Sequence, residues 1–376
     1  MSLLTIEKPK IFENHWPPIG SKIAVCMSGG VDSSTSAYIL KQKGYEIIGL
    51  TGWLIKGSGR CCDNGMVDAS KVCEQIGVNH ISKDLRVFFK QEIVDPFINS
   101  YSIGSTPIPC ITCNNVIKWG LLMDYALGEL GCTHIATGHY AKIVKDGDFF
   151  KIMRSKDTKK DQTFMLWGLT QDVLSKTVFP LGDLTKDEVR KIAVGACYGK
   201  PLCVADKEES QDICFVSDKE GTQGFLEKYL GGKEGNIIEN KTGKILGIHE
   251  GTHNYTIGQR KGLGIAYPEP LYVVRLDVEQ NIVYAGTKDE LEGCELIAKD
   301  VNWIVPDVGT IGRLTLQRVM AKIRYNSKTS PAVVNVLENN QVRVVFDEPQ
   351  SAITPGQACV FYDESDHILL GGGWII

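Results

Sequence analysis

Short apolar runs alternate with longer amphipathic segments in the first part of the chain, and this pattern predicts an α/β fold. The apolar runs have the length of buried strands and lie at 23–25, 45–50, 80–85 and 134–137. The segments between them have helical periodicity and lie at 35–43, 67–76, 87–98 and 111–130. Such an alternation predicts a parallel, doubly wound sheet with a ligand site at the carboxyl ends of its strands.

Two residues mark where these predicted helices end or bend. Gly131 follows the segment at 111–130, and glycine readily takes the left-handed conformation that ends a helix. Pro96 falls inside the segment at 87–98. It predicts an interruption there, because proline lacks the amide hydrogen that a helix interior needs.

The pattern changes beyond residue 140, where turns and short strands become frequent. Alternating runs at 140–144 and 149–154 flank Lys145-Asp146-Gly147 and predict a hairpin. Two helical segments follow, at 169–176 and 186–195.

The second half of the chain has the pattern of β structure. Glycines and short alternating runs between 231 and 264 predict a small, mainly β module. Strands separated by turns predict a compact barrel and lie at 314–323, 332–337, 342–346, 358–362 and 368–370. We therefore divide the chain into an N-terminal extension (1–21), an α/β domain (22–220), a central β-rich domain (221–290) and a C-terminal β-barrel domain (291–376).

Composition narrows the class of protein without identifying it. The chain has 376 residues and a formal net charge of −4, so any contact with nucleic acid must come from local basic patches. No run approaches the roughly 18 consecutive apolar residues of a membrane span, and the N-terminus lacks the pattern of a signal peptide. Twelve cysteines in such a chain indicate reduced thiols, so we expect a cytoplasmic protein with no membrane partner.

The stretch at 26–34, Cys-Met-Ser-Gly-Gly-Val-Asp-Ser-Ser, joins the first predicted strand to the first predicted helix. A glycine turn before a helix N-terminus presents backbone N–H groups to an anion, and the helix dipole favours negative charge there. Asp32 is out of place in a pure phosphate cradle, so we expect it to hold Mg²⁺ or to orient a donor. The stretch has neither a lysine nor the Walker spacing.

The Ser-Gly-Gly-x-Asp-Ser form of this stretch resembles the PP-loop of ATP pyrophosphatases. Those enzymes cleave ATP between the α and β phosphates and use it to adenylate a substrate. The resemblance therefore implies an adenylating enzyme.

A second motif places two thiols near the start of the long predicted helix. Cys110 and Cys113 follow prolines at 107 and 109, at a helix N-terminus where the dipole favours a thiolate. A single C-x-x-C pair is compatible with a redox pair, half of a metal site, or two packing residues. Cys214 stands in a polar run that ends on Ile-Cys-Phe, and a buried strand residue explains it as well as a reactive thiol does.

Six motifs occur in one order along the chain. They are the PP-loop at 26–33, Pro-Cys-x-x-Cys-Asn at 109–114, Thr-Gly-His-Tyr at 137–140, Lys-Asp-Gln-Thr at 160–163, Ser-Gln-Asp-Ile-Cys-Phe at 210–215 and Tyr-Thr-Ile-Gly-Gln-Arg-Lys-Gly at 255–262. Together they resemble the tRNA-specific 2-thiouridylases, from about residue 22 to the C-terminus. These enzymes place sulfur on C2 of the wobble uridine (U34) of the tRNAs for Lys, Glu and Gln.

The resemblance implies a role for particular residues. Cys113 matches the catalytic nucleophile, and Cys214 matches the cysteine that receives sulfur as a persulfide from an upstream donor protein. The segment that faces the flipped target base is Ile108, Pro109 and Cys110. The residues implied to bind ATP are Cys26, Met27, Ser28, Gly29, Gly30, Val31, Asp32, Ser33, Gly52 and Gly138. Those implied to touch tRNA are Lys160, Asp161, Gln162, Arg324 and Tyr325.

The chain departs from the family pattern at Cys110, where many members have Asp. Three cysteines, at 110, 113 and 214, then have the potential to converge and to hold a [4Fe-4S] cluster with one open iron position. A persulfide relay through Cys113 and Cys214 is the other route. It requires the two thiols to come within disulfide range, and we expect the segment around Cys214 to be mobile and to order on tRNA binding.

Other interpretations stay open at this point. The chain is also compatible with a PP-loop ligase that acts on a small molecule, or with a non-catalytic RNA-binding or iron–sulfur carrier protein. His139 is either a base or a packed structural histidine near the nucleotide. A basic run forms either a solvated hairpin face or an RNA contact, and it comprises Lys151, Arg154, Lys156, Lys159 and Lys160.

Overall fold

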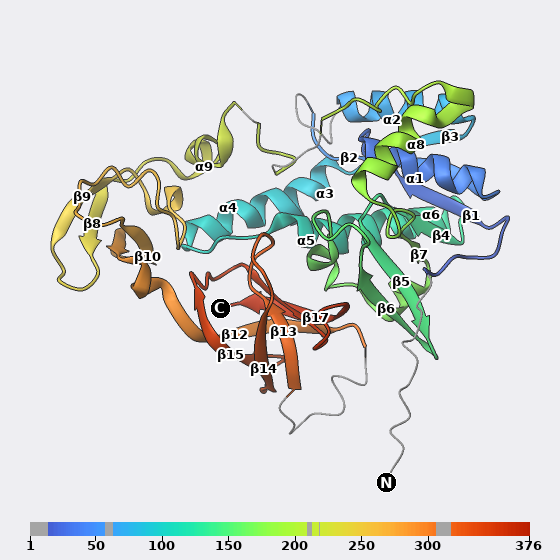
Figure 1. Cartoon of the computed structure of the whole chain (residues 1–376). Coiled ribbons are helices and arrows are strands. Elements are labelled where there is room, and N and C mark those ends of the chain that lie inside the picture. The colour runs from blue at the N-terminus through green and yellow to red at the C-terminus, as the bar shows by residue number, and fades with distance from the viewer. Residues whose placement is uncertain (1–13, 57–62, 209–212, 218, 306–316) are drawn as a thin grey trace, which may run out of the picture.

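The computed structural model describes residues 14–56, 63–208, 213–217, 219–305 and 317–376. Within them the strands form three sheets of five, four and eight strands (Figure 1). In these ranges no helix is both long enough and apolar enough to traverse a lipid bilayer.

The first sheet is parallel and has the strand order β3-β2-β1-β4-β7. Its strands are β1 (Lys22–Cys26), β2 (Glu46–Trp53), β3 (Asn79–Asp84), β4 (His134–Ala136) and β7 (Thr177–Val178). The predicted parallel, doubly wound sheet is confirmed. The sequence pattern missed β7, because two residues at the end of a helical segment are too short to show a strand period.

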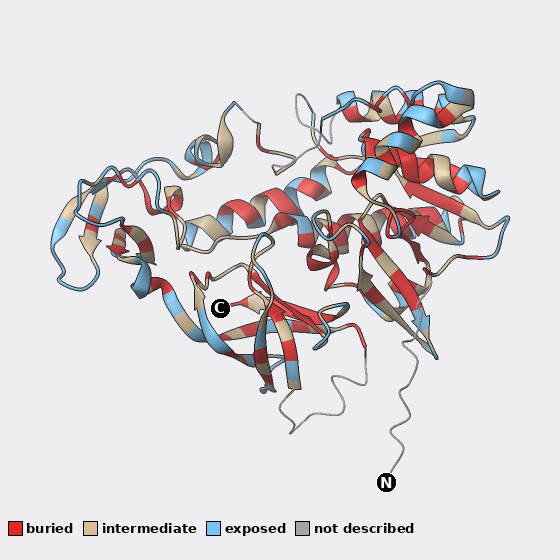
Figure 2. Ribbon diagram, in the orientation of Figure 1, coloured by how far each residue is buried: buried red, intermediate tan, exposed pale blue. Residues whose placement is uncertain are grey.

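The alternation along β1 explains why helices cover both faces of this sheet. Ile23 and Val25 point to one face and Ala24 to the other, and all three are fully buried. One face is covered by α1 (Val31–Gln42), α2 (Asp63–Ile76) and α8 (Lys186–Gly199). The opposite face is covered by α3 (Arg86–Phe89), α4 (Asp95–Ser102) and the helical segment that ends in α6 (Met123–Gly128). Helix α9 (Gly221–Leu230) packs against α4, where Phe225 meets Phe97. Figure 2 shows the central strands buried and the outer sides of α2 and α8 exposed.

Two helices on that second face change to π-helical winding partway along. A π segment at Lys90–Val94 joins α3 to α4, and another at Asn114–Leu122 joins α5 (Pro109–Cys113) to α6. The first π segment ends just before Pro96, where the wider turn makes room for a residue that cannot donate its own helical hydrogen bond. The predicted interruption is therefore a change of winding, and the helix runs on to Ser102.

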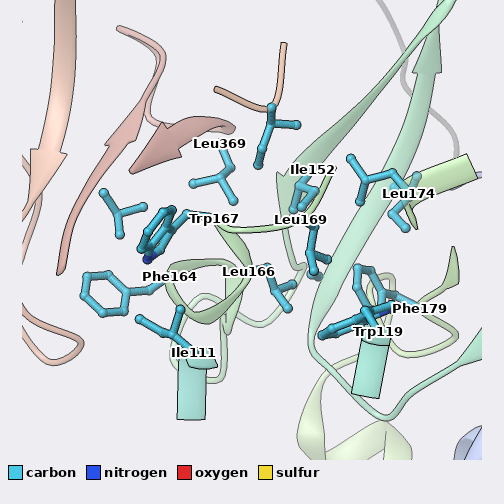
Figure 3. Close-up of a cluster of buried hydrophobic side chains, with 14 of the residues drawn as sticks. Ile111, Trp119, Ile152, Phe164, Leu166, Trp167, Leu169, Leu174, Phe179 and Leu369 are labelled. Carbon is cyan, nitrogen blue, oxygen red and sulfur yellow. The ribbon is translucent and has the colours of Figure 1, made fainter. Parts of the chain in front are cut away.

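The hairpin β5 (Ala141–Asp146) and β6 (Phe149–Arg154) has the predicted form but pairs with the C-terminal sheet. Ile152 and Met153 of β6 align with β17 (Ile368–Ile375). The physical reason is the apolar face of the hairpin. It buries Ile143 and Ile152 in a cluster that also holds Trp167 and Leu369 (Figure 3). The α/β domain and the barrel thus share one hydrophobic core.

The central module is a four-stranded sheet with the order β10-β11-β8-β9. Its strands are β8 (Gly235–Glu239), β9 (Ile245–His249), β10 (Tyr272–Asp277) and β11 (Ile282–Gly286). This is the small, mainly β module that the sequence predicts. Helix α9 precedes it, at a position where the sequence pattern predicts no helix. The domain boundaries at residues 220 and 290 stay predictions.

The C-terminal strands close into a six-stranded barrel, as predicted. They are β12 (Glu292–Trp303), β13 (Gln317–Lys322), β14 (Ser330–Val336), β15 (Val342–Ser351), β16 (Ala358–Tyr362) and β17. The order β12-β15-β14-β13-β16-β17 is closed by pairing of β12 with β17. Residues 314–316 of the predicted strand at 314–323 lie outside the described ranges.

Candidate active site

The loop between β1 and α1 has the geometry of an anion cradle. Gly29 has φ +69°, and a Cβ there would lie 2.3 Å from the carbonyl oxygen of Gly65 at the start of α2. Only glycine fits this approach without a shift of backbone. The amide of Ser28 donates to the hydroxyl of Ser33 at 3.2 Å, which closes the loop over the first turn of α1.

A pocket of about 240 Å³ opens at this loop. Most residues implied to bind ATP line it, namely Cys26, Met27, Ser28, Asp32, Ser33, Gly52 and Gly138. Gly29 and Gly30 lie in the same loop and Val31 begins α1, and none of the three is among the residues that line the pocket. The pocket is at the carboxyl ends of β1, β2 and β4, where an α/β sheet holds its ligand.

Gly138 brings the end of β4 against the start of α1. A Cβ at Gly138 would lie 2.7 Å from the amide nitrogen of Ser33 and 2.9 Å from the carbonyl carbon of Asp32. Both atoms belong to the backbone of the phosphate loop and cannot swing aside. The Thr-Gly-His-Tyr motif therefore needs glycine for close contact with the loop.

The Asp32 carboxylate is held by two partners from distant parts of the chain. The ammonium of Lys186, at the start of α8, donates to its two oxygens at 2.7 and 2.8 Å. The hydroxyl of Tyr140 donates to Oδ1 at 2.8 Å. The Lys186 side chain is 10 % exposed and that of Asp32 is 32 % exposed, so the lysine is shielded from water and the carboxylate is shielded only in part. Sequence inspection found no lysine in the loop, and the fold brings one in from 154 positions away.

This arrangement changes the expectation for Mg²⁺. Asp32 is the one acidic side chain among the described residues that line the pocket, and Lys186 already neutralises it. Mg²⁺ commonly binds one or two carboxylates together with substrate phosphates. Asp32 would fit that role if the metal ion replaced one of the two hydrogen bonds that Lys186 donates to its carboxylate.

Two hydrogen bonds join the Thr-Gly-His-Tyr motif to the Lys-Asp-Gln-Thr motif. The amide of Tyr140 donates to Oε1 of Gln162 at 3.0 Å, and the amide of Gln162 donates to the carbonyl of Tyr140 at 3.0 Å. Gln162, which the resemblance implied to touch tRNA, also lines the nucleotide pocket. The Lys-Asp-Gln-Thr segment is thereby attached to Asp32 through Tyr140.

The other residues implied to touch tRNA lie between the α/β domain and the barrel. The carboxylate of Asp161 is buried and accepts hydrogen bonds from Arg154 at 2.9 Å and from the Thr163 hydroxyl at 2.6 Å. It holds the hairpin in place and is not displayed on the surface. Tyr325 donates to the carbonyl of Asp161 at 3.3 Å, and Arg324 donates to the carbonyl of Ser351 at 2.6 Å. Lys160 is partly exposed at the edge of this network.

Cys113 is the last residue of α5 and lines the nucleotide pocket. The helix starts at Pro109, two residues before the predicted start, with its prolyl ring in the first turn. The π-helical segment begins directly after Cys113, and such segments are frequent at functional sites. Cys110 is exposed, and neither of the two described pockets includes it in its lining.

The target-base segment faces a different cavity. Ile108 and Pro109 line a pocket of about 610 Å³ between α4, the central module and the barrel, together with Arg275 and Trp374. The short helix α5 therefore separates this cavity from the nucleotide pocket, which Cys113 lines. The role of Ile108, Pro109 and Cys110 at the target base stays a prediction.

Cys113 and Cys214 pack at the edge of the same hydrophobic cluster on the second face of the sheet. Phe215 anchors the segment, because its ring lies 5.1 Å from that of Phe97 and 5.5 Å from that of Phe225. Both thiols thus border one apolar layer, and their approach to within disulfide range stays a prediction. The residues at 209–212 and residue 218 lie outside the described ranges, and the expected mobility of the segment around Cys214 stays a prediction.

The described residues do not fit the iron–sulfur cluster that the sequence left open. Within the described ranges, no three His, Cys, Asp or Glu side chains are placed as a metal ion requires. A [4Fe-4S] cluster bound by Cys110, Cys113 and Cys214 needs three converging thiolates. We derive no step through such a cluster.

His139 has the surroundings of a packed, neutral histidine. Its Nδ1 is 2.7 Å from the Thr137 hydroxyl, and its ring packs against Trp119 and Phe179. Burial, reinforced by the charge of Lys118, lowers the pKa of His139 well below 6.5. Of the two predicted interpretations, the structure favours the structural histidine.

The sequence analysis did not identify three lysines that lie near the phosphate loop, because no local motif marks them. Lys118 lines the pocket five residues beyond Cys113, in the π-helical segment, and its ammonium donates to Oδ1 of Asn114 at 2.8 Å. Lys207 donates to the carbonyl of Gly29 at 2.9 Å. Lys186 pairs with Asp32, as described above. All three ammonium groups lie around a loop that contains no lysine, and two of them pair with a carboxylate, Lys186 with Asp32 and Lys207 with Asp68.

The sheet, the glycine loop and the pocket, which Lys118 and Cys113 line, define a nucleotide-binding α/β protein of the PP-loop class. The family model described as tRNA methyl transferase HUP domain matches residues 21–218. The model described as tRNA methyl transferase PRC-barrel domain matches residues 223–287, and the model described as aminomethyltransferase β-barrel domain matches residues 294–375.

The comparisons with individual proteins identify the family. The chain is 50% identical over 357 residues to the tRNA-specific 2-thiouridylase MnmA of Nostoc punctiforme, covering 94% of this chain and 98% of that protein. It is 49% identical over 354 residues to the MnmA of Trichormus variabilis, covering 93% and 97%. This chain belongs to the tRNA-specific 2-thiouridylase family. Among solved structures, it is similar to the U34-tRNA thiolase NcsA from Methanococcus maripaludis, at 23% identity over 46% of this chain and 56% of that chain, with a TM-score of 0.31. That likeness is too partial to support an inference about this chain.

Proposed function

We propose that this protein is a tRNA-uridine 2-sulfurtransferase, which replaces the C2 oxygen of the wobble uridine U34 with sulfur at the expense of ATP. The observation that carries the proposal is the position of Cys113. This residue, which matches the family's nucleophile, lines the same pocket as the phosphate loop. Activation of an oxygen and delivery of sulfur therefore take place in one pocket.

The first step is adenylation. The C2 oxygen of uridine attacks the α-phosphorus of ATP, the bond between the α and β phosphates breaks, and pyrophosphate leaves. Backbone amides of the loop at 26–33 and the N-terminus of α1 hold the phosphates. Lys118 adds positive charge in the pocket where the leaving group develops negative charge, and Lys186 offsets the charge of Asp32. Mg²⁺, bound with the help of Asp32, would neutralise further phosphate charge.

The second step replaces the activated oxygen. The terminal sulfur of a persulfide on Cys214 attacks C2, AMP leaves, and a disulfide links Cys214 to C2 of the base. The Cys113 thiolate then attacks the sulfur of Cys214, which releases 2-thiouridine and leaves a Cys113–Cys214 disulfide. Alternatively, Cys113 first releases hydrosulfide from the persulfide, and the hydrosulfide attacks C2. In both versions a thiol reductant supplies two electrons to reopen the disulfide.

The partners follow from this chemistry. The substrates are the tRNAs for Lys, Glu and Gln, whose wobble base must leave its stack to reach the pocket. Lys160, Gln162, Arg324 and Tyr325 are proposed to contact the tRNA at the junction of the α/β domain and the barrel. A persulfide-bearing donor protein loads Cys214. The cytoplasm holds both tRNA and thiol reductants, so we propose that the reaction occurs there.

Reconstitution tests this proposal. The protein is incubated with unmodified tRNA for Lys, Mg-ATP and a low-molecular-weight persulfide, and thiolated tRNA is detected by its retardation on a mercury-containing gel. We expect a retarded band, loss of that band with Cys113→Ser, and AMP equal in amount to the thiolated tRNA. A small-molecule ligase would release pyrophosphate without tRNA, and a non-catalytic RNA-binding protein would bind tRNA but release no pyrophosphate. Either outcome would overturn the proposal.

A further inference from the structure

The turn at residues 157–160 holds the first residue of α8 through one carboxylate. Oδ2 of Asp157 accepts a hydrogen bond from the amide of Lys186 at 2.9 Å. Oδ1 of Asp157 accepts hydrogen bonds from the amides of Lys159 and Lys160 at 3.1 and 3.2 Å. Hydrogen bonds from backbone amides to a carboxylate are among the stronger ones in proteins. Asp157 therefore fixes the backbone of Lys186 relative to this turn.

The amide of Lys186 is one that α8 cannot satisfy by itself, because the first amides of a helix have no acceptor within it. Thr185 and Glu188 form a capping box that satisfies only their own amides. The carboxylate of Asp157 accepts from the amide between them, where the helix dipole also favours negative charge. A second link, from the Lys156 ammonium to Glu188, joins two half-exposed side chains and contributes little. Asp157 is therefore the main link between the turn and the start of α8.

The side chain of Lys186 extends from this fixed point to the phosphate loop. Its ammonium binds both oxygens of Asp32, at 2.7 and 2.8 Å. Another link starts in the same segment, because Gln162 accepts from the amide of Tyr140, whose hydroxyl donates to Asp32. Asp32 is thus held twice from residues 157–162, the segment that also carries Lys160.

We propose that Asp157 is a positioning residue for ATP binding and adenylation, which holds the Lys186 ammonium against Asp32. This inference rests on the proposed function and adds a residue that lies outside the six motifs. Asp157 is not among the residues that line the nucleotide pocket, and it acts through Lys186. The same carboxylate shapes the turn that carries Lys160, so it joins the segment proposed to contact tRNA to the phosphate loop.

Asp157→Asn tests this role with little change of shape. The asparagine keeps one oxygen for the amides of Lys159 and Lys160, as Asn commonly does in turns. Its NH2 group can only donate, so the amide of Lys186 loses its acceptor. We expect the affinity for a non-hydrolysable ATP analogue to fall about threefold to tenfold. Removal of a negative charge would by itself favour binding of the triphosphate, so a fall in affinity identifies a loss of position and not an effect of charge.

A double-mutant cycle shows whether Asp157 acts through Lys186. Isothermal titration measures the Kd of the analogue for the full-length wild type, Asp157→Asn, Lys186→Met and the double variant. In the Lys186→Met background, Asp157→Asn should change the Kd by less than about twofold, because the ammonium that it positions is gone. The matched control, Asp172→Asn, changes an exposed carboxylate in the first turn of α7 (Gln171–Ser175) and should leave the Kd unchanged. Thermal unfolding shows that each variant is folded; if Asp157→Asn is not, Asp157→Ser takes its place, since a serine hydroxyl also accepts from turn amides.

The outcomes separate this proposal from the proposed function. Binding of the analogue needs neither tRNA nor sulfur, so a wild type that binds it but forms no 2-thiouridine overturns the proposed function alone. A wild type that does not bind the analogue overturns both. Unchanged or tighter binding by Asp157→Asn overturns the positioning role. An equal fall in affinity in the two backgrounds also overturns it, since Asp157 would then act on the fold and not through Lys186.

Discussion

Replacement of Lys186 by Met is the perturbation that tests the charge balance of the pocket most clearly. Methionine keeps most of the apolar stem of the lysine but removes the ammonium that binds both oxygens of Asp32. Asp32 then keeps the bond from the Tyr140 hydroxyl and carries an uncompensated negative charge into a pocket for phosphates. Both folding and nucleotide binding should weaken.

The size of the effect follows from how far the pair is buried. Removal of one partner from a buried ion pair costs about 3–5 kcal/mol. The Lys186 side chain is 10% exposed but that of Asp32 is 32% exposed, so water recovers part of this cost, and we expect about 2 kcal/mol. For a domain of about 200 residues this lowers the melting temperature by about 4–8 °C. Repulsion between Asp32 and the triphosphate should raise the KM for ATP by about tenfold, which corresponds to about 1.4 kcal/mol.

Thermal unfolding and steady-state adenylation measure these two effects. Lys191→Met, an exposed position on α8, is the matched control and should leave both unchanged. The double variant Asp32→Asn with Lys186→Met removes both charges and should be more stable than Lys186→Met alone. Equal melting temperatures for Lys186→Met and the wild type, with an unchanged KM, would show that the ion pair has no role in the pocket.

Three further predictions follow from the described geometry. Gly138→Ala should weaken ATP binding at least about tenfold, because its Cβ would meet the backbone of Ser33 at 2.7 Å; isothermal titration with a non-hydrolysable ATP analogue checks this, and unchanged affinity would contradict the close approach. His139→Gln should flatten the dependence of stability on pH. Burial lowers the pKa of His139 in the folded protein, so below about pH 6.5 the unfolded chain binds a proton at this residue and the folded chain does not. The free energy of unfolding is therefore highest above that pH and falls as the pH decreases below it. Urea unfolding at about pH 7.5 and 5.5 should show a smaller loss in the variant than in the wild type, and an equal loss would mean that His139 is charged in the fold. Iodoacetamide should label Cys110 well before Cys26, because Cys110 is exposed whereas burial raises the pKa of Cys26 to about 12; peptide mass spectrometry shows the order, and early labelling of Cys26 would contradict it.

The sequence predicts the parts of this protein that depend on local pattern. An apolar run predicts strand β1, two glycines predict the loop, and a serine-rich start predicts helix α1. Each of these signals depends only on residues that are close in sequence. The barrel follows from evenly spaced short strands. These elements are confirmed because local propensity and tertiary packing agree in them.

The sequence does not predict contacts that depend on how distant segments fold together. Lys186 and Tyr140 reach Asp32 across 154 and 108 positions, and neither spacing has a local signal. The hairpin at 141–154 has a clear turn signal, but its pairing with β17 depends on an apolar face that finds its partner only in the folded chain. The motif implied that Asp161 touches tRNA, whereas in the structure its carboxylate forms a buried ion pair with Arg154.

A single-turnover experiment tests the coupling of nucleotide pocket and thiols most directly. The protein is loaded with one persulfide sulfur, mixed with Mg-ATP and unmodified tRNA without reductant, and quenched with an alkylating agent. We predict one 2-thiouridine per protein molecule and one Cys113–Cys214 disulfide, seen as a linked peptide by mass spectrometry. Thiolation in equal amount with both cysteines alkylated as thiols would show that sulfur does not travel by this route.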